Sequence, residues 1–190
     1  MDLNDSEIVG TARRLLDESL CSLAPDAAPT PFMVAAGPHG MQHVGLHPMS
    51  DHDFAQTAET VIPAFIILNE AVEIALTAFV ADTAICGSAP ECALIAYWGA
   101  SGRTLFTSVV GRRKTQPPVL AGWLKAPASA SLGSLDEGVH SGLDMARRIL
   151  SPAAHDLRER INMIRLTAAT EDTDTLPLTV DALRDWQWLA

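Results

Sequence analysis

Four closely spaced histidines are the residues of this sequence best suited to chemistry. His39, His43, His47 and His52 lie within fourteen residues, and aspartates flank the last of them. Imidazole and carboxylate groups bind zinc when several converge, but the surrounding glycines and prolines argue against a helix that would stack them. On a strand, His43 and His47 share a face but lie two pleats apart. The metal hypothesis, a small metal-dependent hydrolase using the His39–His52 cluster with His43, His47 and His52 as the metal ligands, stays open; we expect a histidine-rich hairpin surface with no metal or other cofactor.

The charges of the chain are segregated. Residues 15–102 contain ten acidic residues and no Lys or Arg, whereas residues 103–125 contain five basic residues and no acidic one. A net charge of −10 disfavours non-specific binding to nucleic acid, because phosphate repels an acidic protein. The basic stretch either neutralises the acidic part of its own fold or contacts an anion or an acidic partner. The residues available for that contact are Arg103, Arg112, Arg113 and Lys114.

The remaining reactive residues carry no catalytic signature. Cys21, Cys86 and Cys92 form no Cys-x-x-Cys motif, and free, mostly buried thiols are expected. Four carboxylates stand near the ends of predicted strands, where such residues usually mark turns; they are Glu70, Glu73, Asp82 and Glu91. The common nucleotide-binding and hydrolase motifs are also missing from the sequence. We therefore expect a protein that is not an enzyme.

An apolar run from Val61 to Cys86 resembles a membrane span in composition only. Asn69, Glu70 and Glu73 interrupt it, and each is costly in hydrocarbon. Pro63 also removes a helix hydrogen bond. The run is better explained as the end of a helix followed by a central strand, so we expect a soluble, cytoplasmic protein without a signal peptide.

The pattern of apolar residues predicts an α+β fold, with an antiparallel sheet of about five strands, two packed helices and a C-terminal helical arm. A capping box at Asn4 and Glu7 opens the first helix, and a second helix with a kink at Pro63 starts near Ser50 or Asp51. The predicted strands are Phe32–Ala36, Met41–His47, Ala71–Asp82, Glu91–Trp98 and Arg103–Val110, with a possible short edge strand at Val119–Leu124.

The sequence predicts three consecutive parts: a sheet domain (residues 1–125), a helical arm (126–166) and a terminal segment (167–190). In the last part, Thr167–Pro177 is predicted to be a polar, mobile linker before a short helix. Tryptophan at a chain end is a large apolar side chain that needs a docking surface. The residues expected to dock, on the chain itself or on a second subunit, are Trp186, Trp188 and Leu189.

Two resemblances accompany this prediction. The order of elements resembles that of roadblock, longin and profilin-like domains, without their sequence motifs. Residues 31–124 resemble a group of uncharacterised microbial proteins, and the matching segments are Pro31-Phe32, Ala78-Phe79-Val80-Ala81-Asp82 and Pro90-Glu91-Cys92-Ala93. Neither implies an activity. We expect a non-enzymatic interaction or regulatory module that forms a homodimer; tightly bound metal would instead favour the hydrolase.

Overall fold

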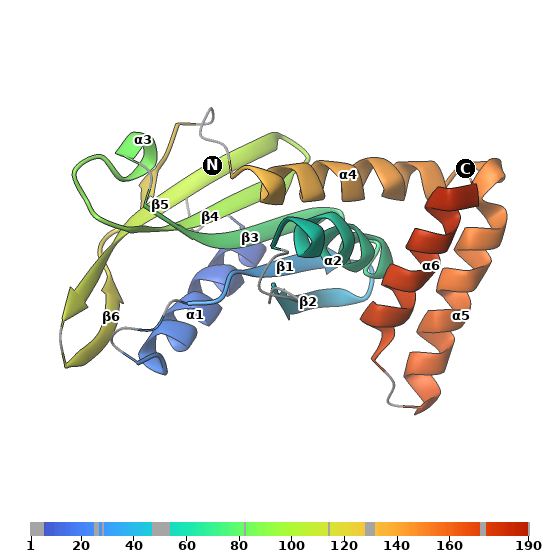
Figure 1. Ribbon diagram of the computed structural model, residues 1–190, viewed down its shortest axis with the longest axis horizontal. Helices are drawn as coiled ribbons and strands as arrows, with labels where there is room; N and C mark the ends of the chain where they lie inside the picture. The colour runs from blue at the N-terminus through green and yellow to red at the C-terminus, as the bar shows by residue number, and fades with distance from the viewer. Residues whose placement is uncertain are drawn as a thin grey trace. The chain divides into compact units, whose positions relative to one another are not determined.

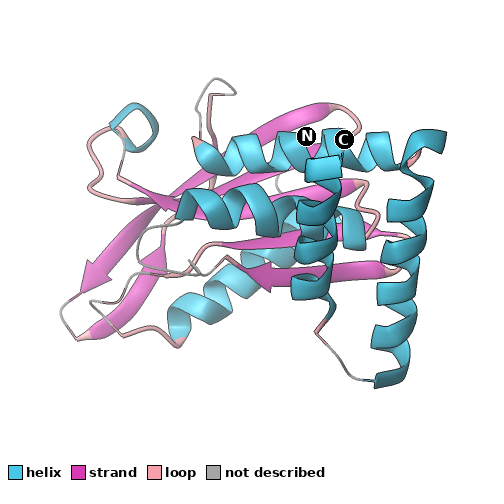
Figure 2. Ribbon diagram, turned by 45° about the vertical axis from the view of Figure 1, so that its right-hand side comes forward, coloured by secondary structure: helices cyan, strands magenta, loops and turns pink. Residues whose placement is uncertain are grey.

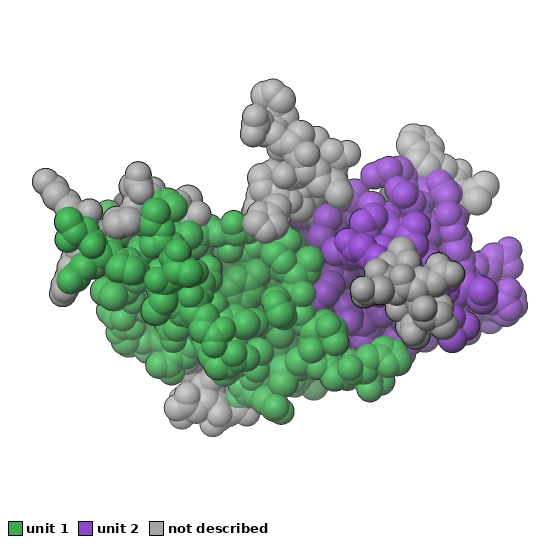
Figure 3. Space-filling view, turned by 90° about the horizontal axis from the view of Figure 1, so that it is seen from below, with its two compact units in different colours: residues 1–46, 72–131 green, residues 47–71, 132–190 purple. Residues whose placement is uncertain are grey.

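The chain forms two compact units in the computed structural model (Figure 3). Unit 1 comprises residues 1–46 and 72–131, and unit 2 comprises residues 47–71 and 132–190. The structure describes residues 6–24, 27, 29–46, 54–81, 83–113, 115–127, 132–171 and 174–189. Residues 47–71 group with the C-terminal helices in unit 2.

Unit 1 is built on an antiparallel sheet (Figure 1). Its strands, seven in the described residues, are β1 (Phe32–Gly37), β2 (Gly40–Gly45), β3 (Glu73–Val80), β4 (Cys92–Gly99), β5 (Gly102–Arg113), β6 (Gln116–Leu120) and β7 (Leu124–Lys125). The order across the sheet is β2-β1-β3-β4-β5-β6, and β7 pairs with β5. The predicted α+β class with an antiparallel sheet is confirmed, and the sheet has more strands than the five expected.

Helix α1 (Glu7–Cys21) covers one face of this sheet. Its buried side chains recur at helical spacing, so they form one apolar stripe; they are Ile8, Val9, Ala12, Leu16 and Leu20. They pack in one core with sheet residues that include Val34, Ala75, Ile95 and Phe106. The helix begins at Glu7 with Ser6 as its N-cap and no side-chain cap hydrogen bond. The predicted cap residue Asn4 lies outside the described residues.

The central strands are buried on both faces, which explains their almost uninterrupted apolar sequences. In β4, the side chains from Cys92 to Trp98 are all buried. Thr77 of β3 is fully buried, and its hydroxyl hydrogen-bonds the backbone of the neighbouring strand. It donates to the carbonyl of Phe32 and accepts from the Phe32 N–H, each at 3.0 Å. This exchange ties the start of β1 to β3 one position beyond the backbone ladder.

Unit 2 is helical, as the secondary-structure colouring shows (Figure 2). It contains α2 (Phe54–Leu68), α4 (Ser134–Ile149), a single 3₁₀ turn (Pro152–Ala154), α5 (His155–Glu171) and α6 (Thr175–Leu189). The short helix α3 (Thr83–Cys86) belongs to unit 1. A buried apolar cluster joins the helices of unit 2, and its members include Ile67, Met145, Ile161, Ile164, Val180 and Leu183. No helix in the described residues is long and apolar enough to span a bilayer.

Two glycines allow α2 and α4 to approach closely. A Cβ built at Gly138 would lie 2.4 Å from the Ala58 carbonyl oxygen, and one at Gly142 would lie 2.9 Å from Pro63 Cα. Real Cβ atoms do not approach backbone atoms at the first of these distances, so α4 requires glycine where it crosses α2. Pro63 lies inside α2, which continues through it to Leu68.

The C-terminus of α2 is closed by a Schellman motif and an arginine from α5. The Ala71 N–H donates to the Ile66 carbonyl, the Glu70 N–H donates to the Ile67 carbonyl, and Glu70 has a φ of +47°. Arg165 then donates to the carbonyls of Leu68 (3.0 Å) and Ile67 (2.9 Å), and its guanidinium lies 2.6 Å from a Glu70 carboxylate oxygen. The last turn of α2 contains no basic residue, so α5 supplies the positive charge that this helix end favours.

The C-terminal region is more helical than predicted. Helix α5 continues to Glu171 and α6 begins at Thr175, so helices occupy most of the stretch expected to be a linker, Thr167–Pro177. Polar composition alone is misleading here, because residues 167–171 continue a helix whose buried stripe, Leu157, Ile161 and Ile164, lies before them.

Candidate functional site

The histidine cluster is only partly described. His39 lies in the turn between β1 and β2, His43 lies on β2, and both side chains are exposed. His47 and His52 lie outside the described residues. No group of three metal-ligating side chains occurs in the part of the chain that the structure describes. The zinc hypothesis, whose named ligands are His43, His47 and His52, therefore stays a prediction.

The basic stretch makes contacts within unit 1. Arg112 donates from Nε and Nη2 to the two carboxylate oxygens of Glu91, at 2.8 and 3.3 Å, and from Nη1 to the Ala27 carbonyl at 3.1 Å. Arg103 lies over the Trp98 ring, 5.6 Å from its centroid. The Glu91 contact favours self-neutralisation for Arg112, whereas the ring that Arg103 contacts is uncharged. The side chain of Arg113 and all of Lys114 lie outside the description.

The carboxylates near the strand ends have structural partners. Glu70 closes α2 with Arg165, and Glu91 binds Arg112. Glu73 accepts a 2.7 Å hydrogen bond from the Tyr97 hydroxyl. Burial, and then this hydrogen bond, raise the pKa of Tyr97 above its usual value. These pairings match the expectation that the carboxylates mark turns and strand ends; Asp82 lies outside the described residues.

The C-terminal docking residues lie at the end of α6. The helix extends to Leu189, so Trp186, Trp188 and Leu189 are helical, but their side chains are outside the description. One turn and two turns earlier, Leu183 and Val180 are buried in the core of unit 2. The apolar stripe predicted for this helix is therefore present where its side chains are described, and the docking of the tryptophans stays a prediction.

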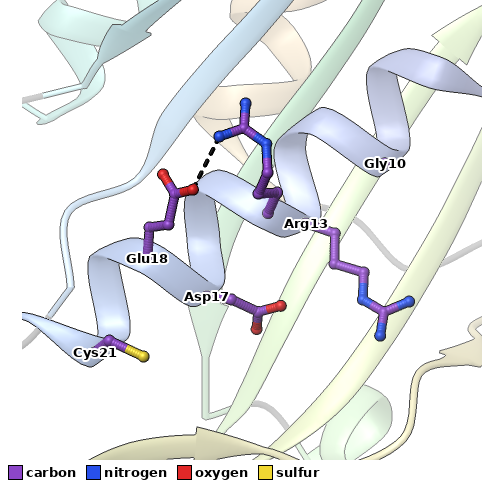
Figure 4. A pocket seen from close by; sticks show the side chains of 6 residues that line it. Gly10, Arg13, Asp17, Glu18 and Cys21 are labelled. Atoms are coloured by element: carbon purple, nitrogen blue, oxygen red, sulfur yellow. Dashed lines mark hydrogen bonds and ion pairs between the residues drawn. The ribbon is translucent and has the colours of Figure 1, made fainter.

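A hollow in each unit is lined by described residues, and neither of these two gathers catalytic groups. One follows the outer face of α1, where Figure 4 shows Arg13, Asp17 and Glu18 around it. The ion pair Arg14–Glu18 beside it, at 2.9 Å, joins side chains that are more than half exposed, so it contributes little to stability. The other, of about 230 Å³, lies in unit 2 with an apolar floor that includes Pro63, Met145 and Leu183.

Two buried thiols lie together at one end of β3 and β4. The Cys86 thiol, at the end of α3, donates to the Val80 carbonyl at 3.2 Å, and Val80 is the register partner of Cys92. Because Val80 and Cys92 are neighbours across the ladder, the Cys86 thiol lies beside the backbone of Cys92. Burial, followed by the interaction with the neighbouring Cys86 thiol and the charge of Glu91, raises the pKa of Cys92 to about 11. The sequence predicts buried thiols, but a spacing of six residues carries no signal that they meet.

One edge of the sheet is formed by β2, which pairs only with β1 among the described strands. The direction of its backbone groups follows from alternation along an antiparallel ladder. The Leu46 N–H donates to the Pro31 carbonyl at 2.7 Å, so every second residue from Leu46 back along β2 faces β1. The Val72 N–H binds the Ala36 carbonyl, so the alternate residues of β1 face β3 instead. Both observations require that Met41, His43 and Gly45 direct their N–H and C=O groups away from β1.

The two outer edges of the sheet differ in chemistry. The β2 segment Gly40–Gly45 contains no proline and no Lys, Arg, Asp or Glu. The opposite edge strand β6 contains Pro117 and Pro118, which have no N–H to offer to a further strand. Comparison of the chain with protein-family models, with curated proteins and with solved structures finds no match.

Proposed function

We propose that this protein is a non-enzymatic interaction module that self-associates as a homodimer by pairing β2 with β2 of a second copy. The observation that carries the proposal is the outward-facing row of backbone groups at Met41, His43 and Gly45. Such a row is a template for strand addition, and proteins that avoid strand addition usually block it with charge, proline or a bulge.

An antiparallel pairing centred on His43 uses this row completely. His43 then faces the same residue of the second copy, and Met41 faces Gly45 of that copy, in both directions. Each of these pairs exchanges two backbone hydrogen bonds. At roughly 0.5–1.5 kcal/mol net for each bond, the ladder supplies roughly 3–9 kcal/mol, compared with about 8 kcal/mol for micromolar affinity. The apolar side chains of Met41 and Val44, both partly buried, add contact area.

Charge favours this edge over the rest of the surface. Two copies of a chain with net charge −10 repel each other at most orientations. The β2 segment is uncharged when its histidine is neutral, so pairing there brings no carboxylates together. The two arginines of the basic stretch whose contacts are described bind within unit 1, which makes them weaker candidates for holding a partner.

The test replaces one backbone N–H at the edge. The variant His43→Pro removes an outward N–H without removing a hydrogen bond of the β1–β2 ladder, so the fold should persist while the dimer is lost. The matched control His43→Ala removes the same side chain but keeps the N–H. Light scattering at micromolar concentration should give twice the 20.3 kDa monomer mass for the parent and for His43→Ala, and the monomer mass for His43→Pro.

A monomeric parent protein at this concentration would refute the proposal. A dimer that survives His43→Pro, with an unchanged circular dichroism spectrum, would place the interface elsewhere. Deletion of Thr179–Ala190 then tests the C-terminal tryptophans as the alternative dock.

A further inference from the structure

We propose that Cys86 and Cys92 form an intrachain disulfide when a low-molecular-weight disulfide oxidises the folded protein. This modification site is independent of self-association through β2. Both cysteines belong to unit 1, and the chain contains one other cysteine, Cys21.

Cys86 and Cys92 lie at the same end of β3 and β4. Cys92 is the first residue of β4 and is paired in register with Val80 of β3. The Cys86 Sγ lies 3.2 Å from the carbonyl oxygen of that same Val80. Because Val80 and Cys92 are direct neighbours across the ladder, this contact places the Cys86 thiol beside the backbone of Cys92. A disulfide requires that the two Cβ atoms be close and directed at each other, and this placement brings the two cysteines near enough for a local rearrangement to join them.

The connection between the cysteines is shaped for this approach. After α3 the chain reverses direction through Gly87, whose φ is +60°, and the Ala89 N–H binds the Cys86 carbonyl at 3.0 Å. Beyond the turn, Glu91 is held by Arg112, and its carbonyl accepts from the Val110 N–H. The loop is thus fixed at both ends, which keeps the two cysteines in neighbouring positions in the folded state.

Exposure sets the order of the reaction. Cys86 is 8% exposed and Cys92 is 2% exposed, so an oxidant from solvent reaches Cys86 first. The Cys86 thiolate attacks one sulfur of glutathione disulfide and expels one glutathione thiolate, which leaves a mixed disulfide on Cys86. Cys92 then loses its proton to solvent and attacks the Cys86 sulfur, expelling the second glutathione. Two protein thiols are oxidised to one disulfide, and one glutathione disulfide is reduced to two glutathione thiols.

The environment of Cys92 makes the second step slow at neutral pH. The pKa of Cys92, raised to about 11 by burial and by the neighbouring Cys86, keeps it almost entirely in the thiol form, and only the thiolate attacks. The rate of closure should therefore increase about tenfold for each unit of pH up to the pKa, if thiolate formation limits it. Exposed Cys21 should react without this dependence on Cys92, and it ends as a mixed disulfide because no other cysteine is left to resolve it.

The experiment treats the folded protein with glutathione disulfide, blocks free thiols with N-ethylmaleimide, and digests with a protease that cleaves after glutamate. Cleavage after Glu18, Glu59, Glu73, Glu91 and Glu137 places each cysteine on its own peptide. The expected product is the peptide 74–91 joined to the peptide 92–137, with the mass of the sum less two hydrogen atoms. Dithiothreitol should separate them. The peptide 19–59 should carry glutathione.

Two variants make the result decisive. Cys92→Ser should stop at the mixed disulfide, so that the peptide 74–91 carries glutathione. Cys21→Ser should leave the link between Cys86 and Cys92 intact. The proposal is overturned if the folded parent keeps Cys86 and Cys92 alkylated while Cys21 is glutathionylated, or if the link joins Cys21 to either of the other two. It is also overturned if closure occurs only in denaturant.

Discussion

The close crossing of α2 and α4 makes a sharp prediction about Gly138. The variant Gly138→Ala adds one methyl group at a point where its carbon would lie 2.4 Å from the Ala58 carbonyl oxygen and 3.3 Å from Ile62 Cδ1. The nearer atom belongs to the backbone of α2 and cannot rotate away. Nonbonded atoms of these types prefer separations of about 3.5 Å or more, so the two helices must move apart locally by about 1 Å.

Two opposing terms set the size of the effect. Alanine stabilises a helix interior by about 1 kcal/mol relative to glycine. Overpacking a well-packed contact typically costs about 1–3 kcal/mol, and a clash with backbone lies at the upper end of that range. We therefore expect Gly138→Ala to lower the free energy of unfolding of unit 2 by about 1–2 kcal/mol, although the substitution favours the helix itself.

A control on the same helix isolates the packing term. Ser141 is exposed on α4, so the variants Ser141→Gly and Ser141→Ala measure the helix preference of alanine over glycine without a contact. Denaturant unfolding followed by circular dichroism gives both differences. Alanine should be more stable than glycine by about 1 kcal/mol at position 141 and less stable than glycine at position 138. An equal gain at both positions would refute the close crossing.

Three further predictions concern buried or partly buried polar groups, each measured by denaturant unfolding. Because the folded state raises the pKa of Cys92 from 9.0 to about 11, the neutral thiol stabilises the fold fully below pH 9 and this contribution is lost as pH rises through 11; the loss is about 3 kcal/mol. Cys92→Ala should flatten that part of the stability profile, and an unchanged slope would contradict the cause. Arg165→Met should lower the free energy of unfolding by about 2–3 kcal/mol, because two carbonyls of α2 and Glu70 lose a charged donor. The control Arg160→Met breaks an exposed pair with Asp185 and should lower it by less than about 1 kcal/mol. Equal losses would show that Arg165 does not cap α2. Thr77→Val should lower the free energy of unfolding by about 1–3 kcal/mol, because the N–H and C=O of Phe32 lose their hydroxyl partner. Thr77→Ser should retain most of the stability. If Thr77→Val leaves the free energy of unfolding unchanged, the two hydrogen bonds to Phe32 do not stabilise the fold.

Local patterns predicted the strands well. The apolar runs at β1, β3 and β4 and the glycine-containing turn before β5 fixed the antiparallel sheet, because period, turn chemistry and burial agree there. The outermost strands were harder to predict. Pro117 and Pro118 indicated that the short sixth strand lies at an edge. They were not counted as part of that strand, so its predicted start was Val119, whereas β6 begins at Gln116. The two-residue strand β7 depends on its pairing with β5, which the local sequence does not encode.

Long-range partners limited the prediction of the candidate site. No local pattern links Arg165 to the end of α2, because the hydrogen bond to the Leu68 carbonyl spans ninety-seven residues of chain. The meeting of Cys86 and Cys92 depends on the turn between α3 and β4, and the outward direction of the His43 backbone depends on the register of β1 and β2. The residue types were visible in the sequence; their partners follow only from the folded topology.

The discontinuity of unit 2 has a consequence for synthesis on the ribosome. Helix α2 emerges before residues 72–131, which belong entirely to unit 1, and only then can α4, α5 and α6 follow. Translation adds about 5–20 residues per second, so roughly 3–12 seconds pass between the synthesis of α2 and that of the first of these helices. During that interval Ile62 and Ile66, both fully buried in the finished protein, lack the α4 glycines that they later contact. The nascent chain therefore exposes an apolar helix, and a chaperone that binds apolar helical segments would bind residues 54–68.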